Sequence, residues 1–224
     1  MRPFYVPPHG TEQPIEHNRL VDVYNLETGE TVFLMAQCQR DFSERVRFGP
    51  RTGTPALQNP ANWIAQNIEE IAYLSHDYSP VRPILIPVPI AAFMDENLVT
   101  ACHAAILRTP LCPQEVCLEI DDATVTLMGP SLNPTLEALK RHGFRLSLNA
   151  TLTATAALSE NLRLLLDTLR LDARRFEKEA DMQDRVEAAR AAGIALIAEN
   201  AFWRDGPYLA RHGIDYGINP RRDG

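Results

Sequence analysis

The sequence predicts an α/β protein, a single closed TIM-like (β/α)8 barrel whose first strand is antiparallel to the second. Short apolar runs alternate with longer helical patterns along the 224 residues, which is typical of a parallel sheet. Eight such runs are present, the number that closes a barrel of this kind. A short turn signal separates the first two runs, and it is too short for a parallel crossover. An open doubly wound sheet is the alternative, but no glycine-rich phosphate loop follows an early strand.

The chain is expected to hold one domain after a short lead-in. Residues 1–19 are polar and contain prolines, so they are expected to form a flexible N-terminal lead-in. Residues 20–224 are expected to form the barrel, because 45% hydrophobic residues suffice for one large core. Neither a signal peptide nor a membrane-spanning run is recognised, and a cytoplasmic location is expected.

A hairpin, a loop and a helix are expected first. The hairpin strands are residues 21–25 and 31–38. Residues 41–59 carry charges, glycine and proline without periodicity, which predicts a loop. Apolar residues then recur with helical spacing over residues 60–74, and Asn59 precedes them as a candidate N-cap.

Strands and helices alternate over the rest of the chain. The expected strands are residues 84–88, 116–120, 145–149, 168–172, 194–198 and 214–217. The expected helices are residues 96–107, 133–142, 156–166, 174–192 and 208–212. His142 and His212 each precede a glycine near a helix end, which favours a capping role.

Composition argues against several classes of function. A net charge of −7 and a pI near 5.4 do not indicate a nucleic-acid partner. The cysteines lack paired metal-ligand spacing and are expected to be reduced, mostly buried thiols. They are Cys38, Cys102, Cys112 and Cys117. The six histidines are scattered, and we expect neither a metal ion nor another cofactor.

Several strand ends carry short motifs that together resemble those of one known protein family. Residues 26–29 approximate the family's Leu-Thr-Gly hairpin, and residues 35–37 (Met-Ala-Gln) stand in place of Glu-Ala-Leu. Residues 118–122 resemble its Glu-Leu-Thr-Glu strand, and residues 145–154 the strand ending in Asp-Asp-Phe-Gly-Thr-Gly. Further similar motifs follow in the family's order at residues 167–172, 197–200 and 213–217. Together these motifs resemble those of the EAL domain family, the cyclic di-GMP phosphodiesterases. The resemblance covers about residues 20–220 and implies an EAL-like barrel.

The resemblance also implies that this member is degenerate. The family's first metal-binding glutamate falls on Met35, and its asparagine ligand falls on Pro87. Its two bridging aspartates fall on Asn149 and Ala150. Thioether, proline and alanine side chains are not ligands for Mg²⁺ or Mn²⁺. The family's phosphate-binding arginine and its late glutamine are replaced by Gln39 and Ile218.

Three charged positions of the family are kept. Glu119 matches a metal-ligand glutamate, Arg170 keeps the charge of the active-site lysine, and Glu199 matches a glutamate near the attacking water. Asp122 is a shortened version of a glutamate that supports the site. These residues are either a remnant ligand site or a structural ion pair. We favour the ion pair, in which Arg170 neutralises one of two repelling carboxylates through a bidentate contact.

The sequence therefore predicts a catalytically inactive, EAL-like regulatory protein that binds another protein in a bacterial signalling pathway. The alternatives are a cyclic di-GMP receptor without hydrolysis and, third, an active phosphodiesterase. We expect no cyclic di-GMP binding, because Gln37 and Gln39 replace family residues. The resemblance implies a homodimer through the loop and helix after residues 145–149. Phe202 and Trp203 are either a partner-binding surface or packed core.

Overall fold

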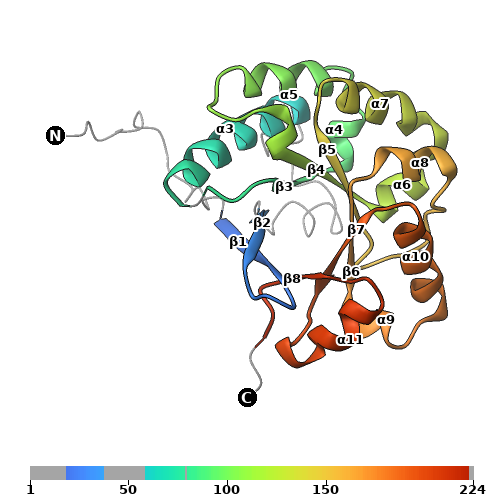
Figure 1. Ribbon diagram of the computed structural model, residues 1–224. Coiled ribbons are helices and arrows are strands. Elements are labelled where there is room, and N and C mark those ends of the chain that lie inside the picture. Colours follow the sequence, from blue (N-terminus) through green and yellow to red (C-terminus); the bar gives the residue numbers. More distant parts are fainter. Residues whose placement is uncertain (1–18, 38–58, 79, 222–224) are drawn as a thin grey trace, which may run out of the picture.

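The protein is described by a computed structural model that covers residues 19–37, 59–78 and 80–221. The strands form a closed barrel in the order β1-β2-β3-β4-β5-β6-β7-β8, and helices surround it (Figure 1). β1 (Arg19–Asn25) is antiparallel to β2 (Thr31–Gln37) and to β8 (Tyr216–Ile218). The other neighbouring strands are parallel. The prediction of a (β/α)8 barrel with an antiparallel first strand is confirmed.

The parallel strands alternate with one or more helices. The remaining strands are β3 (Ile84–Val88), β4 (Val116–Asp121), β5 (Arg145–Asn149), β6 (Thr168–Asp172) and β7 (Ala195–Glu199). The α-helices are α3 (Pro60–Tyr78), α4 (Ile90–Phe93), α5 (Leu98–Ile106), α6 (Asp122–Met128), α7 (Asn133–Arg141), α8 (Glu160–Leu165), α9 (Ala173–Phe176), α10 (Ala180–Ala191) and α11 (Gly206–Arg211). Short 3-10 turns are η1 (Pro113–Glu115), η2 (Gly129–Leu132) and η3 (Trp203–Asp205). Among the described residues, no helix combines the length and apolar character needed to cross a bilayer.

The barrel has an outer and an inner core, because successive side chains of a strand point to opposite faces. Leu118 and Ile120 of β4 belong to the large cluster between the barrel and its helices. Cys117 belongs to a smaller cluster inside the barrel. Glu119 is two residues from Cys117 and therefore points inward as well. Because of this alternation, polar side chains such as that of Glu119 lie in the interior of the barrel.

Helix ends follow the local sequence signals. The Oδ1 atom of Asn59 accepts a hydrogen bond from the backbone N–H of Asn62 at 3.0 Å, which confirms the predicted N-cap. His142 and His212 occupy the C-caps of α7 and α11. Gly143 and Gly213 follow them with φ values of 89° and 77°, a left-handed conformation that favours glycine. The predicted capping positions of His142 and His212 are confirmed, whereas α3 ends at Tyr78 rather than at residue 74.

Two predicted helices differ in the structure. The sequence predicts one helix over residues 174–192, but α9 ends at Phe176 and α10 begins at Ala180. The side chain of Gln183 donates to the backbone oxygen of Phe176 at 3.1 Å and thereby satisfies a carbonyl at the break. The helix predicted over residues 156–166 begins only at Glu160, because Ser159 caps it through the N–H of Leu162.

The cysteines are free thiols where the structure describes them. Cys102 and Cys117 are buried and Cys112 is exposed, whereas Cys38 lies outside the described residues. Burial raises the pKa of the Cys102 thiol to about 12. Burial also raises the pKa of Cys117, far above the ordinary range. The prediction of reduced, mostly buried thiols is confirmed for these three residues.

Candidate functional site

The carboxyl ends of β2 to β8 meet at one mouth of the barrel, where enzymes of this architecture hold their active sites. The mouth contains a cavity of about 310 Å³. Its lining is mostly polar and consists of Arg19, Val21, Gln37, Glu199, Asn200, Ile218, Asn219 and Arg221. Arg19 reaches this end because β1 runs antiparallel to β2 and β8.

Arg170 connects Glu119 and Glu199 beside this cavity. Its Nε and NH2 atoms donate to the two carboxylate oxygens of Glu119 at 2.8 and 2.6 Å. Its NH1 atom donates to Oε2 of Glu199 at 2.9 Å. The side chains of Arg170 and Glu119 are only 7% and 1% exposed, whereas that of Glu199 is 37% exposed. The predicted bidentate ion pair is confirmed, and it extends to a second carboxylate.

The electrostatics of this cluster favour the charged guanidinium. Burial by itself lowers the pKa of Arg170, but the negative charges of Glu119 and Glu199 outweigh burial and raise that pKa. One positive charge thus faces two negative charges, and its pair with Glu119 is shielded from water. The fork of the guanidinium occupies both oxygens of Glu119, which leaves no oxygen of that carboxylate without a protein partner.

The positions assigned to replaced family ligands lie around the same mouth. Met35 is buried in the inner apolar cluster, and Pro87 is the β-sheet neighbour of Glu119. Ala150 is fully buried. Asn149 donates through Nδ2 to Asp121 at 2.8 Å, and its Oδ1 accepts from the backbone and hydroxyl of Thr151 at 3.1 and 2.8 Å. Asn149 therefore organises the turn after β5. Gln39 lies outside the described residues.

A second buried ion pair fixes the segment after β5. Asp122, at the start of α6, is fully buried and accepts from the backbone N–H groups of Thr155 and Ala156 at 2.8 and 3.1 Å. Arg185 of α10 donates to the same carboxylate at 2.6 Å and also to the backbone oxygen of Ala156. Asp122 and Arg185 thus join α6, α10 and the loop into one unit.

Sequence reasoning missed Arg185, although a signal was present. Met182, Val186 and Ala189 form the buried stripe of α10, and Arg185 lies three residues after Met182 on the same stripe. A charged residue in such a stripe indicates a buried partner. Ser147 was missed as well: its hydroxyl is buried on β5 and has no hydrogen-bond partner among the described residues.

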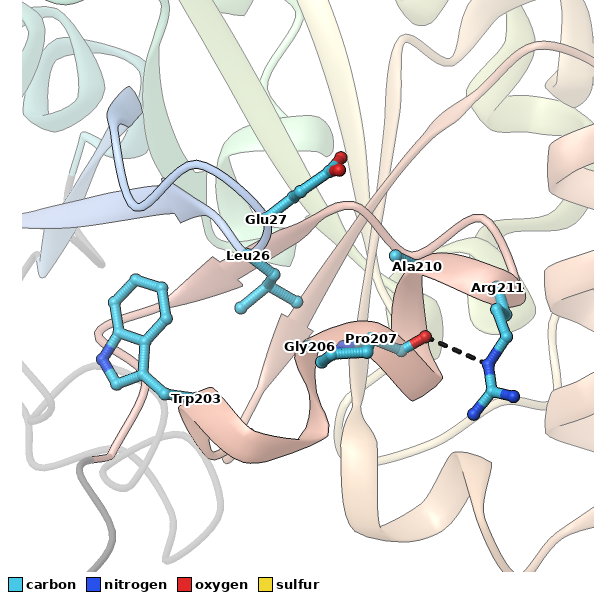
Figure 2. A pocket seen from close by; sticks show the side chains of 7 residues that line it. All are labelled: Leu26, Glu27, Trp203, Gly206, Pro207, Ala210 and Arg211. Carbon is cyan, nitrogen blue, oxygen red and sulfur yellow. Dashed lines mark hydrogen bonds between the residues drawn. The ribbon is translucent and has the colours of Figure 1, made fainter.

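A larger cavity, of about 540 Å³, lies between the β1–β2 turn and α11 (Figure 2). It is lined by Leu26, Glu27, Trp203, Gly206, Pro207, Ala210 and Arg211. Trp203 packs edge-on against Tyr24 with ring centroids 5.5 Å apart, and Arg204 lies over the ring of Phe202 at 4.8 Å. Phe202 and Trp203 are both half-buried. Phe202 and Trp203 are therefore neither fully packed in the core nor fully exposed as a partner-binding surface.

Within the part of the chain that the structure describes, no three His, Cys, Asp or Glu side chains lie together in an arrangement able to hold a metal ion. The carboxylates of the mouth are instead engaged by protein donors. Glu119 and Glu199 bind Arg170, Asp122 binds Arg185, and Asp121 binds Asn149.

Comparisons with known proteins agree with this architecture. A family model described as EAL domain matches residues 58–201. The structure of the PaMucR phosphodiesterase in complex with c-di-GMP aligns with a TM-score of 0.71 and 17% identity, covering 90% of this chain and 87% of that chain. The EAL domain of Mycobacterium smegmatis DcpA aligns with a TM-score of 0.69 and 20% identity, covering 90% and 89%.

A third similar structure contains a metal. Klebsiella pneumoniae BlrP1 in a manganese and cyclic di-GMP complex aligns with a TM-score of 0.70 and 16% identity, covering 95% of this chain and 56% of that chain. A comparison with curated protein sequences finds no match. At identities this low, the structural likeness supports the shared barrel alone.

Proposed function

Since this chain belongs to the EAL domain family of cyclic di-GMP phosphodiesterases, we propose that it is a catalytically inactive member. We propose further that it acts as a regulatory protein by binding another protein. The observation that carries the first part is the ion pair of Arg170 with Glu119, which uses both oxygens of the one retained metal-ligand carboxylate.

The donor set at the mouth does not fit a pair of divalent cations. Hydrolysis by two metals needs oxygen ligands that clamp both the attacking and the leaving oxygen. Mg²⁺ is held by carboxylates and other hard oxygen ligands. Met35, Pro87 and Ala150 supply none from their side chains, and the amide of Asn149 is engaged by Asp121 and Thr151. These side chains therefore do not supply the ligands that two-metal hydrolysis needs.

Displacing Arg170 to admit a metal ion would be costly. The guanidinium is almost fully buried, and its Nε, NH1 and NH2 atoms all donate to carboxylates. A cation that took over Glu119 would leave this buried charge without its main partner. Uncompensated buried charges cost several kcal/mol, on the order of 3–5 in protein variants. The contact of the Arg170 guanidinium with Glu119 thus supports the proposal that Glu119 has a structural role.

We expect no turnover of cyclic di-GMP by the purified protein with Mg²⁺ or Mn²⁺, beyond the rate of Glu119→Ala. Loss of single charge-stabilising donors typically costs about 10²–10³ in rate, and several are replaced here. An active EAL phosphodiesterase assayed in parallel is the positive control. Hydrolysis by the wild type that disappears in Glu119→Ala would refute catalytic inactivity.

A cyclic di-GMP receptor without hydrolysis is the second candidate. The polar mouth cavity and its two arginines, Arg19 and Arg221, favour it, because guanidinium groups bind phosphate well. Isothermal titration of the purified protein with cyclic di-GMP separates the two candidates. Calcium replaces Mg²⁺ and Mn²⁺ in this experiment. Micromolar binding weakened by Arg221→Ala would favour the receptor over a protein that acts only through protein partners.

The partner-binding part of the proposal is supported by apolar surface. Leu127 of α6 and Leu152 of the loop after β5 are 76% and 65% exposed. The hydroxyls of Thr126 and Thr155, 3.0 Å apart, connect α6 to this loop. A homodimer through this region is part of the proposal. We expect Leu152→Glu to abolish specific capture of a partner, or self-association, and the control Leu107→Glu to retain it. This result would support the region around Leu152 as the binding surface.

A further inference from the structure

Two histidines from different helices meet on the outside of the barrel, away from the mouth cavity. His103 lies in the last turn of α5, and His142 is the C-cap of α7. The two helices are neighbours on the outer layer (Figure 1). The imidazole rings have centroids 4.6 Å apart and an angle of 49° between their planes. His103 is half-buried and His142 is exposed, so the pair is open to solvent.

The ring nitrogens of this pair are available as ligands. Among the described residues, the rings of His103 and His142 contact each other and neither ring makes a hydrogen bond. In most structural contexts an imidazole N–H finds a carboxylate or carbonyl partner. Two neighbouring imidazoles without such partners have lone pairs free for a third species.

The separation of the rings suits a shared metal ion. A metal about 2.1 Å from one nitrogen of each imidazole, with a ligand–metal–ligand angle of about 90–110°, separates the ring centroids by about 4.6–5.3 Å. The observed distance of 4.6 Å is at the lower end of that interval. Neutral imidazole is a good ligand for zinc, nickel and copper ions. The separation of the rings is therefore compatible with one ion bound by both imidazoles.

The helix ends favour a cation at this place, whereas the charge of the neighbouring Arg141 opposes one. Both histidines are at the C-terminal ends of helices, where the backbone carbonyls give a partial negative charge. Lys140, the nearest lysine in the sequence, has its ammonium group bound to Asp167 at 2.8 Å. The left-handed Gly143 fixes the backbone directly after His142.

We propose that His103 and His142 form a binding site for a divalent transition-metal ion that joins α5 to α7. No third His, Cys, Asp or Glu of the described residues completes a cluster there, so the protein supplies two ligands and water fills the other positions. Such a site is independent of the mouth of the barrel and of its lost catalytic metals. Metal binding there stabilises the folded chain, because both ligands come together only in the fold.

The test is titration of the full-length protein with Ni²⁺ and, separately, Zn²⁺ at about pH 7.5, where an ordinary imidazole is neutral. We expect one ion per chain and a rise in melting temperature with metal concentration. His103→Ala and His142→Ala should each weaken binding by at least about tenfold, since each removes one of two ligands. The affinity of each ion for the wild type is compared with its affinity for the two variants.

Matched controls separate this site from other histidines. His76, at the end of α3, is exposed, and His76→Ala should bind the metal like the wild type. The double variant His9→Ala/His17→Ala removes the N-terminal histidines and should also retain binding. Far-UV circular dichroism confirms that each variant is folded. Absence of binding to the wild type, or unchanged binding by folded His103→Ala and His142→Ala, would overturn the proposal.

Discussion

Arg170→Ala is expected to lower the free energy of unfolding by about 3–5 kcal/mol, as removal of one partner from a buried ion pair does. The change leaves the carboxylate of Glu119 buried without either of its two charged hydrogen bonds. It also removes the contact that holds Glu199 next to Glu119. Urea unfolding of the wild type and the variant measures the effect. Because Arg170 has a structural role in this account, affinity for cyclic di-GMP should be equally absent in both.

The size of this effect separates a buried pair from a surface pair. Arg108→Ala is the matched control, because Arg108 also contacts a glutamate, Glu69, but is 55% exposed. Exposed pairs contribute about 0–1 kcal/mol. The double variant Arg170→Met/Glu119→Leu removes both charges and should recover much of the stability lost in Arg170→Ala. If Arg170→Ala unfolds at the same urea concentration as the wild type, the structural role of the pair is wrong.

Asp122→Asn is expected to lower the unfolding free energy by a similar amount, about 3–5 kcal/mol. The amide cannot neutralise Arg185, whose side chain is only 8% exposed, and it accepts fewer hydrogen bonds from the loop after β5. The backbone N–H groups of Thr155 and Ala156 should exchange with solvent faster in the variant, because they donate to this carboxylate. Asp184→Asn, at an exposed position of α10, should leave stability and exchange unchanged.

The same residue gives a pH dependence with a defined sign. Burial by itself raises the pKa of Asp122, but the hydrogen bond from Thr155 and the charge of Arg185 outweigh it and lower that pKa. Because the pKa of Asp122 is lower in the folded state, its ionised carboxylate stabilises the fold at pH values above the unfolded-state pKa of about 3.9. This stabilisation is lost as the pH falls through the folded-state pKa. The wild type should therefore lose stability more steeply than Asp122→Asn as the pH falls below about 5. If the unfolding free energies of the wild type and of Asp122→Asn fall equally with pH, the stabilising role of the Asp122 carboxylate is wrong.

The barrel was predictable because its signals are local and repeated. Each parallel strand is a short apolar run, and the hairpin turn at residues 26–30 decides the direction of β1. The predictions failed for the helical layer at the mouth. α6 begins directly at Asp122 after β4, and no helix was predicted at these residues. The break between α9 and α10 depends on the side chain of Gln183, which periodicity does not reveal.

The candidate site was predictable in part, for a chemical reason. Two inward-facing carboxylates need a cation, and Arg170 was the charged residue that strand alternation placed beside them. The hydrogen bonds that Asn149 makes with Asp121 and Thr151 depend on the turn after β5, which no sequence pattern defined. The position of the 540 Å³ cavity depends on the packing of α11 over the β1–β2 turn. Such contacts between distant segments need coordinates.

The central claim is that the barrel mouth does not hold two divalent cations, because protein groups engage the carboxylates and other donors are replaced. Anomalous diffraction from crystals soaked in manganese tests it most directly. We expect no pair of manganese peaks beside Glu119, with Arg170 still bound to that carboxylate. Two strong peaks next to Glu119, with the guanidinium displaced, would contradict the account.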